Sequence, residues 1–213
     1  MIMKVVAFNG SSRRNGNTTG CINTVFAELT KEGIECEMIQ VGKKKIAGCV
    51  ACYGCMKNQN ERCVVEDDPV NEWVQKMKDA DGILLGSPVH FAGVAGAMKS
   101  FLDRAFFVST MNGNLYRHKV GASVAAVRRS GGISTVDTLN HYIQYSEMFM
   151  PTANYWNVAY GTAPGEMEKD DEGKQIMTLL GRNMAWLMKV MEAGKKEVPA
   201  PAAVEKTATN FIR

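Results

Sequence analysis

Four cysteines lie close together in residues 48–63, a segment that reads GCVACYGCMKNQNERC. It holds four of the six cysteines in the chain, Cys49, Cys52, Cys55 and Cys63, with two, two and seven residues between them. The two short spacings bring three thiolates around a small volume, and the longer excursion returns the fourth. Such a four-cysteine set suits an iron–sulfur cluster, for which compact cysteine spacings are typical. We call residues 48–63 the cysteine loop.

Three interpretations of the cysteine loop remain open from the spacing alone. The first is a 4Fe–4S cluster, and the second is zinc, although structural zinc more often uses two separated cysteine pairs. The third is a set of free or partly oxidised thiols, because a reducing cytosol disfavours disulfide staples. Cys21 and Cys36 fall in a predicted helix and a predicted strand, where we expect small core residues rather than ligands.

A hydroxyl-rich loop, NGSSRRNGNTTG at residues 9–20, joins the first predicted strand to the first predicted helix. The unpaired amides at a helix N-terminus and the macrodipole attract anions, and serine and threonine hydroxyls add donors. The loop lacks the Gly-Lys-Ser/Thr ending of a triphosphate loop and the Gly-x-Gly-x-x-Gly dinucleotide fingerprint. It therefore suits one phosphate monoester; the alternative is a turn whose Asn17 or Thr18 caps the helix. We call residues 9–20 the phosphate loop.

Two further loops carry features that suit a flat ligand. Residues 86–104, GSPVHFAGVAGAMKSFLDR, combine a proline and close glycines with the rings of His90 and Phe91. Residues 128–135, RRSGGIST, follow the next predicted strand with two more glycines. One loop for phosphate and two for a planar group, in this order along one sheet edge, indicate a flavin mononucleotide site.

The elements that position these loops alternate between short apolar strands and helix-period segments. Strands are expected at Lys4–Phe8, Ile34–Val41, Gly82–Gly86, Val120–Val127 and around Tyr155–Val158. Helices are expected at Thr18–Lys31, Val70–Lys78, Met98–Phe106, Ser134–Glu147 and Ile176–Met191. The pattern predicts a parallel sheet covered on both faces, with ligands at the shared carboxyl edge of the strands.

Length and composition fit one domain. The chain has 213 residues, of which 46% are hydrophobic, and a net charge of +3. The sequence has no basic stripe with interleaved aromatics, so we do not expect a nucleic-acid partner. It also shows no signal peptide and no apolar run of membrane-spanning length. We expect a cytoplasmic protein. Residues 1–194 should form the folded domain, and residues 195–213 an irregular tail.

The loops together resemble those of the flavodoxin-like NAD(P)H-dependent FMN reductases, and within them the iron–sulfur flavoproteins. NGSSRRNGNTT is similar to the family's phosphate loop, SPVHFAGVAGAMKSFLDR to its isoalloxazine loop and following helix, and CVACYGCMKNQNERCVVEDD to its compact cysteine motif. Ser12 stands where the family usually has proline, and His90 where tyrosine is common. The resemblance implies a three-layer α/β/α sandwich with five parallel strands in the order 2-1-3-4-5.

The resemblance also implies a set of cofactor-binding residues. The phosphate ligands would be Ser11, Arg13, Asn17, Thr18 and Thr19. Pro88, Val89, His90, Phe91 and Gly93 would frame the isoalloxazine, and Ser130, Gly131 and Gly132 would approach its polar edge. The metal ligands would be Cys49, Cys52, Cys55 and Cys63. No obligatory acid–base side chain is expected, because the flavin carries the chemistry; His90 is the one candidate for titration near neutral pH.

The function implied is FMN-dependent oxidation and reduction. The leading hypothesis is an electron-transfer iron–sulfur flavoprotein that receives electrons from NAD(P)H or a ferredoxin and passes them to a quinone, flavin or small molecule. One alternative is an NAD(P)H-dependent FMN or quinone reductase without a cluster, and another is a non-enzymatic FMN or metal-binding sensor. Family members are usually dimers or tetramers, and Phe211 and Ile212 in the tail are expected to dock on a neighbouring subunit.

Overall fold

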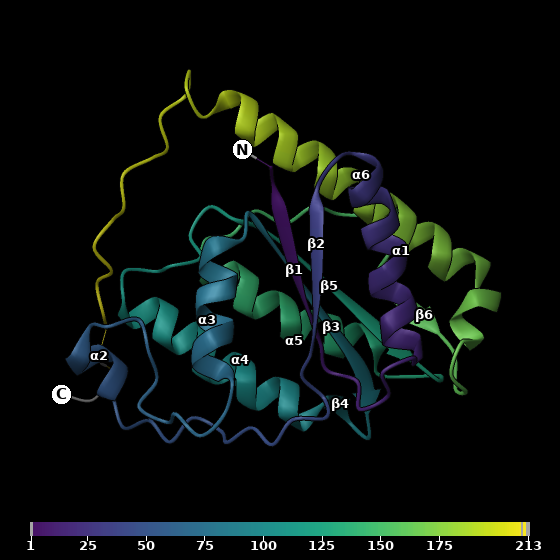
Figure 1. The fold of residues 1–213 in the computed structure, drawn as a ribbon, viewed down its shortest axis with the longest axis horizontal. Coiled ribbons are helices and arrows are strands. Elements are labelled where there is room, and N and C mark those ends of the chain that lie inside the picture. The colour runs from purple at the N-terminus through teal and green to yellow at the C-terminus, as the bar shows by residue number, and fades with distance from the viewer. Residues whose placement is uncertain (1, 210, 212–213) are drawn as a thin grey trace.

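The computed structural model describes residues 2–209 and 211 of the chain, and Figure 1 shows their arrangement. Five parallel strands run through the centre in the spatial order β2-β1-β3-β5-β6. Their bounds are β1 Lys4–Asn9, β2 Glu35–Gln40, β3 Gly82–His90, β5 Val120–Val127 and β6 Val158–Tyr160. Counted as five strands in chain order, this is the expected order 2-1-3-4-5, so the flavodoxin-like prediction is confirmed.

A two-residue strand, β4 (Gly93–Val94), adds a feature that the sequence did not predict. It pairs antiparallel with the end of β3, Val89 opposite Val94 and His90 opposite Gly93. As a result β3 extends to His90 rather than ending at Gly86 as expected. The Ser87 hydroxyl accepts a hydrogen bond of 3.0 Å from the Ala95 amide, which fastens the far side of this hairpin to the strand.

Helices cover both faces of the sheet (Figure 1). One face packs against α1 (Asn17–Lys31) and α6 (Asp171–Gly194), and the other against α3 (Val70–Asp79), α4 (Gly96–Met111) and α5 (Gly132–Tyr145). Alternate residues of β1 divide between the two cores: Val5 and Ala7 face α1 and α6, whereas Val6 and Phe8 face α3 and α4. The period-2 alternation of strand side chains thus supplies two cores from one buried strand.

Other predicted boundaries were wrong as well. The last strand begins at Val158, so Tyr155 and Trp156 lie in the preceding loop, where their rings meet edge to face. The last helix begins at Asp171, earlier than the apolar period indicates, because Asp170 caps it by accepting from the Gly173 amide at 2.9 Å. Two short elements complete the fold: α2 (Gly54–Asn58) inside the cysteine loop, and the 3-10 turn η1 (Glu166–Lys169).

Beyond α6 the described part of the tail has no helix or strand. It runs back over the domain, where the Arg117 guanidinium donates to the carbonyls of Pro201 and Ala202, and Lys206 lies over the ring of Tyr145. Phe211 is exposed, and Ile212 lies outside the described residues. Among the described helices, none has the length and apolar character needed to cross a membrane.

Candidate functional site

The phosphate loop is shaped mainly by hydrogen bonds within its own segment. The Ser11 amide donates to Asn9 Oδ1 at 2.9 Å, the Arg13 amide to Ser11 Oγ at 3.1 Å, and Thr19 Oγ1 to the Arg14 carbonyl at 2.7 Å. Helix α1 then begins at Asn17 with Gly16 at the N-cap, which provides no side-chain acceptor for the first amides. The expected alternative, a turn capped by Asn17 or Thr18, is therefore wrong, and the helix N-terminus is open to an anion.

A cavity of about 250 Å³ lies over this helix end. Among the described residues, the buried Thr18 hydroxyl has no hydrogen-bond partner, and Thr18 lines the cavity. Two arginines also line it: Arg13, whose guanidinium donates to the Thr162 carbonyl at 3.0 Å, and Arg128 at the end of β5. An unpartnered buried hydroxyl, two positive charges and an uncapped helix fit a phosphate group.

Two of the five expected phosphate ligands, Asn17 and Thr19, use their side chains to fix nearby backbone. Asn17 lines the cavity, but its amide group donates to the Ala163 carbonyl at 3.0 Å and accepts from the Met167 amide at 3.2 Å. Its side chain therefore fixes the loop after β6. The Thr19 hydroxyl is committed to the Arg14 carbonyl and to the Asn9 side chain, and Thr19 does not line the cavity. Ser11, Arg13, Asn17 and Thr18 line the cavity, and among them the Thr18 hydroxyl has no other partner among the described residues.

The hairpin after β3 brings three of the expected flavin-framing residues to the same cavity, namely Pro88, Val89 and His90. Phe91 sits at the hairpin tip with a left-handed backbone, φ 58°, and its ring is fully exposed. Gly93 pairs with His90 inside the hairpin. The structure thus places Pro88, Val89 and His90 beside the phosphate loop, and leaves the ring of Phe91 outside the cavity.

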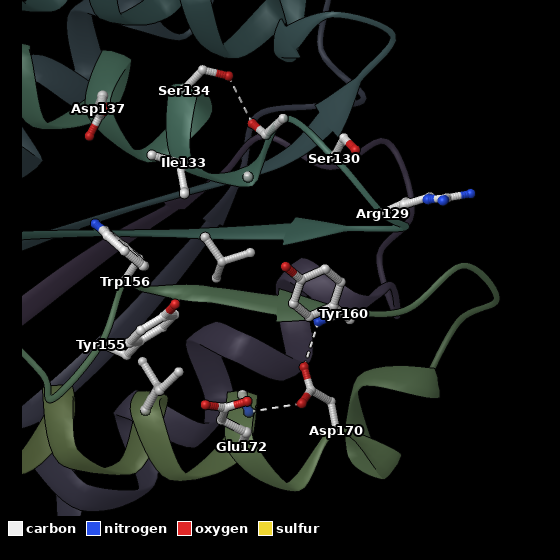
Figure 2. A pocket seen from close by; sticks show the side chains of 15 residues that line it. Arg129, Ser130, Ile133, Ser134, Asp137, Tyr155, Trp156, Tyr160, Asp170 and Glu172 are labelled. Atoms are coloured by element: carbon white, nitrogen blue, oxygen red, sulfur yellow. Dashed lines mark hydrogen bonds between the residues drawn. The ribbon is translucent and has the colours of Figure 1, made fainter.

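The third expected loop lines a neighbouring cavity of about 620 Å³ (Figure 2). Ser130, Gly131 and Gly132 form its wall at the start of α5, opposite Tyr160 and Asp170. Gly131 has φ +88° and packs so close to Val89 that an added Cβ would lie 3.0 Å from its side chain. A glycine suits this position because it tolerates the positive φ and has no Cβ to collide with Val89. The third loop therefore packs directly against the β3 hairpin at Gly131.

All four cysteines of the cysteine loop line a single cavity against α4. Cys49 and Cys52 are exposed, Cys63 is half-buried and Cys55 is buried. Burial raises the pKa of the Cys55 thiol above its ordinary value, and the nearby Cys63 and Cys49 sulfurs raise it further. Cys21 lies elsewhere, fully buried in the core, and burial raises its pKa to about 12.

The cysteine loop is fastened by polar side chains from two helices. Asn71 on α3 accepts from the Cys63 amide at 2.7 Å and donates to the Cys63 carbonyl at 2.9 Å. Asn112, after α4, accepts from the Glu61 amide at 2.9 Å and donates to the Cys55 carbonyl at 3.3 Å. These contacts fix both ends of the segment between Cys55 and Cys63.

Arg104 on α4 is a third fastening, and its side chain is fully buried. Its Nε donates to Cys63 Sγ at 3.3 Å, and its terminal nitrogens donate to Asp68 and to the carbonyls of Val65 and Ala47. Burial acts to lower the pKa of Arg104, yet its hydrogen bonds with Asp68 and Cys63 outweigh this and raise it. The guanidinium therefore stays charged beside the cysteines.

The backbone of the cysteine loop is unusual. Four non-glycine residues have left-handed φ: Ala51 (51°), Tyr53 (57°), Gln59 (46°) and Glu61 (59°). Each such residue costs of order 1 kcal/mol and persists only where surrounding contacts hold it. Left-handed residues alternating with right-handed ones turn backbone amides toward a common concavity, an arrangement found at many iron–sulfur sites.

The described side chains contain no group of three or more His, Cys, Asp or Glu residues placed to hold a single metal ion. Four thiolates around one zinc must converge within about 4 Å of one another, because each lies about 2.3 Å from the metal. A cluster binds each thiolate to a different iron and therefore needs thiols spread around a cavity. The four thiols that line the cavity are a donor set that either zinc or an iron–sulfur cluster can use.

Several residues at these cavities were not predicted from the sequence. Arg128, Gly161 and Thr162 line the phosphate cavity from the ends of β5 and β6. Asn71, Arg104 and Asn112 hold the cysteine loop. The one available signal was Arg104, a charge within the apolar face of Met98, Phe101, Leu102, Ala105 and Phe106. Asp68, just before α3, accepts from the Val70 amide at 3.1 Å.

Comparison with known proteins identifies relatives over most of the chain. The sequence model described as NADPH-dependent FMN reductase matches residues 3–163. An iron–sulfur flavoprotein of Methanocaldococcus jannaschii is 36% identical over 197 residues, covering 89% of this chain and all of that protein. The iron–sulfur flavoprotein of Methanosarcina thermophila is 26% identical over 84% of this chain and 95% of that protein.

Solved structures with the same fold include two flavin-related proteins. RosB, solved with a bound 8-demethyl-8-formylriboflavin-5′-phosphate intermediate, superposes with a TM-score of 0.68 at 17% identity, covering 99% of this chain and 94% of RosB. An archaeal flavodoxin superposes with a TM-score of 0.57 at 16% identity, covering 88% of this chain and 99% of the flavodoxin. At these identities the likeness concerns the fold.

Proposed function

The chain belongs to the NADPH-dependent FMN reductase family and is an FMN-dependent oxidoreductase, and from this premise we propose that it is an electron-transfer iron–sulfur flavoprotein. FMN would occupy the cavity over α1, and a 4Fe–4S cluster the cavity of the cysteine loop. The single observation that carries the proposal is the meeting of all four cysteines at one cavity. The curated relatives support it, because they are described as iron–sulfur flavoproteins.

The roles of the protein at the flavin are binding and orientation. When bound, FMN supplies hydride acceptance and electron transfer. Ser11, Arg13 and Thr18 would hold its phosphate with the amides of α1, and Arg128 would add a second charge. Pro88, Val89 and His90 would frame the ring, with Ser130, Gly131 and Gly132 beyond it. RosB, which has the same fold, binds a riboflavin phosphate derivative.

At the cysteine loop, the ligands would be Cys49, Cys52, Cys55 and Cys63. A thiol must lose its proton to become a ligand, and the Arg104 guanidinium donates a hydrogen bond to Cys63 Sγ. The walls contributed by Phe107 and Val108 limit water on the α4 side. NAD(P)H or a ferredoxin would donate electrons, and a quinone, flavin or small molecule would accept them, in the cytoplasm.

The test is composition after purification without oxygen. The cluster proposal expects FMN together with about four iron and four sulfide per chain. Flavin bands without iron or sulfide would contradict it and leave the alternative, an FMN or quinone reductase with idle thiols. Absence of both flavin and NAD(P)H oxidation would overturn the FMN assignment itself.

The tail would contribute to assembly. The docking group in this proposal is Phe211, which is exposed near the end of a segment that contacts Arg117 and Tyr145. We expect a homodimer or homotetramer in which this ring docks on a neighbouring subunit. Deleting residues 205–213 should shift light scattering toward smaller species, and an unchanged mass would contradict this role.

A further inference from the structure

Within residues 2–209 and 211, Arg104 is the one fully buried charge whose contacts reach a cysteine of the loop. Among the hydrogen bonds described in the structure, it is also the one side chain that donates to a cysteine sulfur, at 3.3 Å from Nε to Cys63 Sγ. Its remaining donors go to Asp68, Val65 and Ala47. It thereby joins both flanks of the cysteine loop, residues 47 and 65, to the middle of α4.

We infer that Arg104 is a positioning residue for the proposed cluster: it fixes Cys63 and stabilises added negative charge at that sulfur. The inference rests on the proposed function, since it concerns the group that the cysteines would hold. A guanidinium has five donors in a fixed plane and cannot lose its charge, so it can hold four acceptors at once in one orientation. Lysine has no comparable geometry.

The buried pair with Asp68 determines how strong this effect is. Asp68 cancels most of the Arg104 charge, because the two groups are hydrogen-bonded with both side chains almost fully buried. What remains at Cys63 is the N–H dipole and a small residual positive potential. Hydrogen bonds to the sulfurs and local charge set the potential of such clusters, so the two members of the pair should act in opposite directions.

The position of Arg104 also relates the cysteine loop to the flavin loops. Helix α4 begins at Gly96, directly after the β3 hairpin, and Arg104 lies eight residues further on. At 1.5 Å per residue this is about 12 Å along one rigid helix. A clamp on α4 therefore holds the cysteines at a fixed place relative to the expected isoalloxazine loop.

The experiment measures the cluster midpoint potential by anaerobic redox titration monitored by electron paramagnetic resonance. Reduction adds one negative charge near Cys63, so Arg104→Gln should shift the potential to more negative values and change the spectrum. Arg104→Lys, which keeps the charge but not the planar donors, should shift it less. Asp68→Asn should shift it to more positive values, because the guanidinium is then uncompensated.

Arg62→Gln is the matched control, because Arg62 is adjacent to Cys63 in the chain but its side chain is exposed. The cluster midpoint potential of Arg62→Gln should equal that of the wild type. Loss of iron from Arg104→Gln with flavin and circular dichroism retained would also support the inference. If Arg104→Gln does not fold, the inference is tested by whether Asp68→Asn shifts the cluster potential to more positive values.

The outcome that overturns the inference is a wild-type potential and spectrum in folded Arg104→Gln, or an unshifted potential in Asp68→Asn. Either would leave the cluster in place, so the proposed function would stand. A wild-type protein that holds flavin but no iron would instead overturn the cluster proposal, and this inference with it. Iron analysis of the wild type therefore separates the two failures.

Discussion

The phosphate loop and the cysteine loop both extend from the carboxyl end of a strand, yet they are held in different ways. In the phosphate loop, several hydrogen bonds join residues two to five positions apart, although Gln40 donates to the Ser11 carbonyl and Arg13 to the Thr162 carbonyl, and no residue has a left-handed φ. The cysteine loop has four left-handed non-glycine residues. It is fastened by Arg104 and Asn112, which lie 36 to 57 positions from their partners in and around the loop, and by Asn71.

The difference indicates how each loop meets its expected ligand. The phosphate loop keeps donors unused: an uncapped helix and the unpartnered Thr18 hydroxyl. An anion would complete it. In the cysteine loop, hydrogen bonds from Asn71, Arg104 and Asn112 hold the strained backbone before any ligand binds. The ligand would therefore not have to order this loop. The first loop should therefore gain order on binding, and the second should keep its shape only while its fastenings remain.

The largest expected effect is the loss of the cluster from a single cysteine substitution. If the proposed cluster is present, Cys55→Ala removes one of its four ligands, so iron and sulfide should be lost while the flavin bands persist. Transfer from a one-electron protein donor should fall with them, whereas hydride transfer from NAD(P)H to free flavin or a quinone, where present, should continue. Iron, sulfide and FMN content measure this.

Cys36→Ala serves as the control for that substitution, because Cys36 lies half-buried in β2 outside the cysteine loop. It should retain iron and flavin at the wild-type ratio. Equal iron in wild type and Cys55→Ala would show that the loop does not ligate it.

A smaller effect is expected when a fastening of the cysteine loop is removed. Asn71→Ala deletes three hydrogen bonds, to the Cys63 amide and to the carbonyls of Cys63 and Val65. At about 1 kcal/mol each, the unfolding free energy of the apoprotein should fall by about 3 kcal/mol. Urea titration measures this, with Asn60→Ala as the control.

Asn60 lies in the same loop, is exposed, and accepts only from the Arg62 amide at 3.2 Å in its immediate neighbourhood. Its loss should change stability by less than about 0.5 kcal/mol. If both variants were equally stable, the inference that Asn71 fastens the cysteine loop would fail.

The third effect concerns the affinity for FMN. Arg13→Ala removes a cationic donor from the phosphate cavity and should weaken FMN binding by about 1–3 kcal/mol, the scale of a charge-assisted hydrogen bond. Arg14→Ala removes the neighbouring arginine, which does not line the cavity, and should leave the affinity near that of the wild type. Fluorescence titration of the apoprotein compares them, and equal losses would mean that general charge, not position, attracts the phosphate.

The same contrast explains what the sequence predicts and what it does not. The phosphate loop could be predicted because a hydroxyl-rich segment between a strand and a helix is a local pattern, and the fold because strand and helix periods are local patterns. Arg128 and Thr162 could not be assigned to the phosphate cavity, because β5 and β6 bring them there only in three dimensions.

The cysteine spacing predicted a common site for the four thiols but not its support. Asn71 and Arg104 are single polar residues within amphipathic helices, and nothing in their local sequence names a partner. Left-handed φ values at Ala51 and Tyr53 contradict the preferences of those residue types, and tertiary contacts impose them. The sequence also did not predict β4, the second strand of the β3 hairpin, because Gly93 and Val94 are too few residues to show a strand period.

The smallest effect tests the unused donor of the phosphate loop. Thr18→Val replaces the hydroxyl by a methyl group of similar size, and in the apoprotein this hydroxyl is buried without a partner among the described residues. Removing an unsatisfied buried donor should leave the unfolding free energy unchanged or slightly higher. With FMN the sign reverses, because the hydroxyl would donate to the phosphate; affinity should fall by about 0.5–1.5 kcal/mol, or about two- to twelve-fold. Thr24→Val, in the same helix, removes a hydroxyl that donates to the Gly20 carbonyl at 2.9 Å and should not change FMN affinity. If Thr18→Val binds FMN with the wild-type affinity, the phosphate does not contact this hydroxyl. The inference that the ligand supplies the missing partner of the phosphate loop would then be wrong.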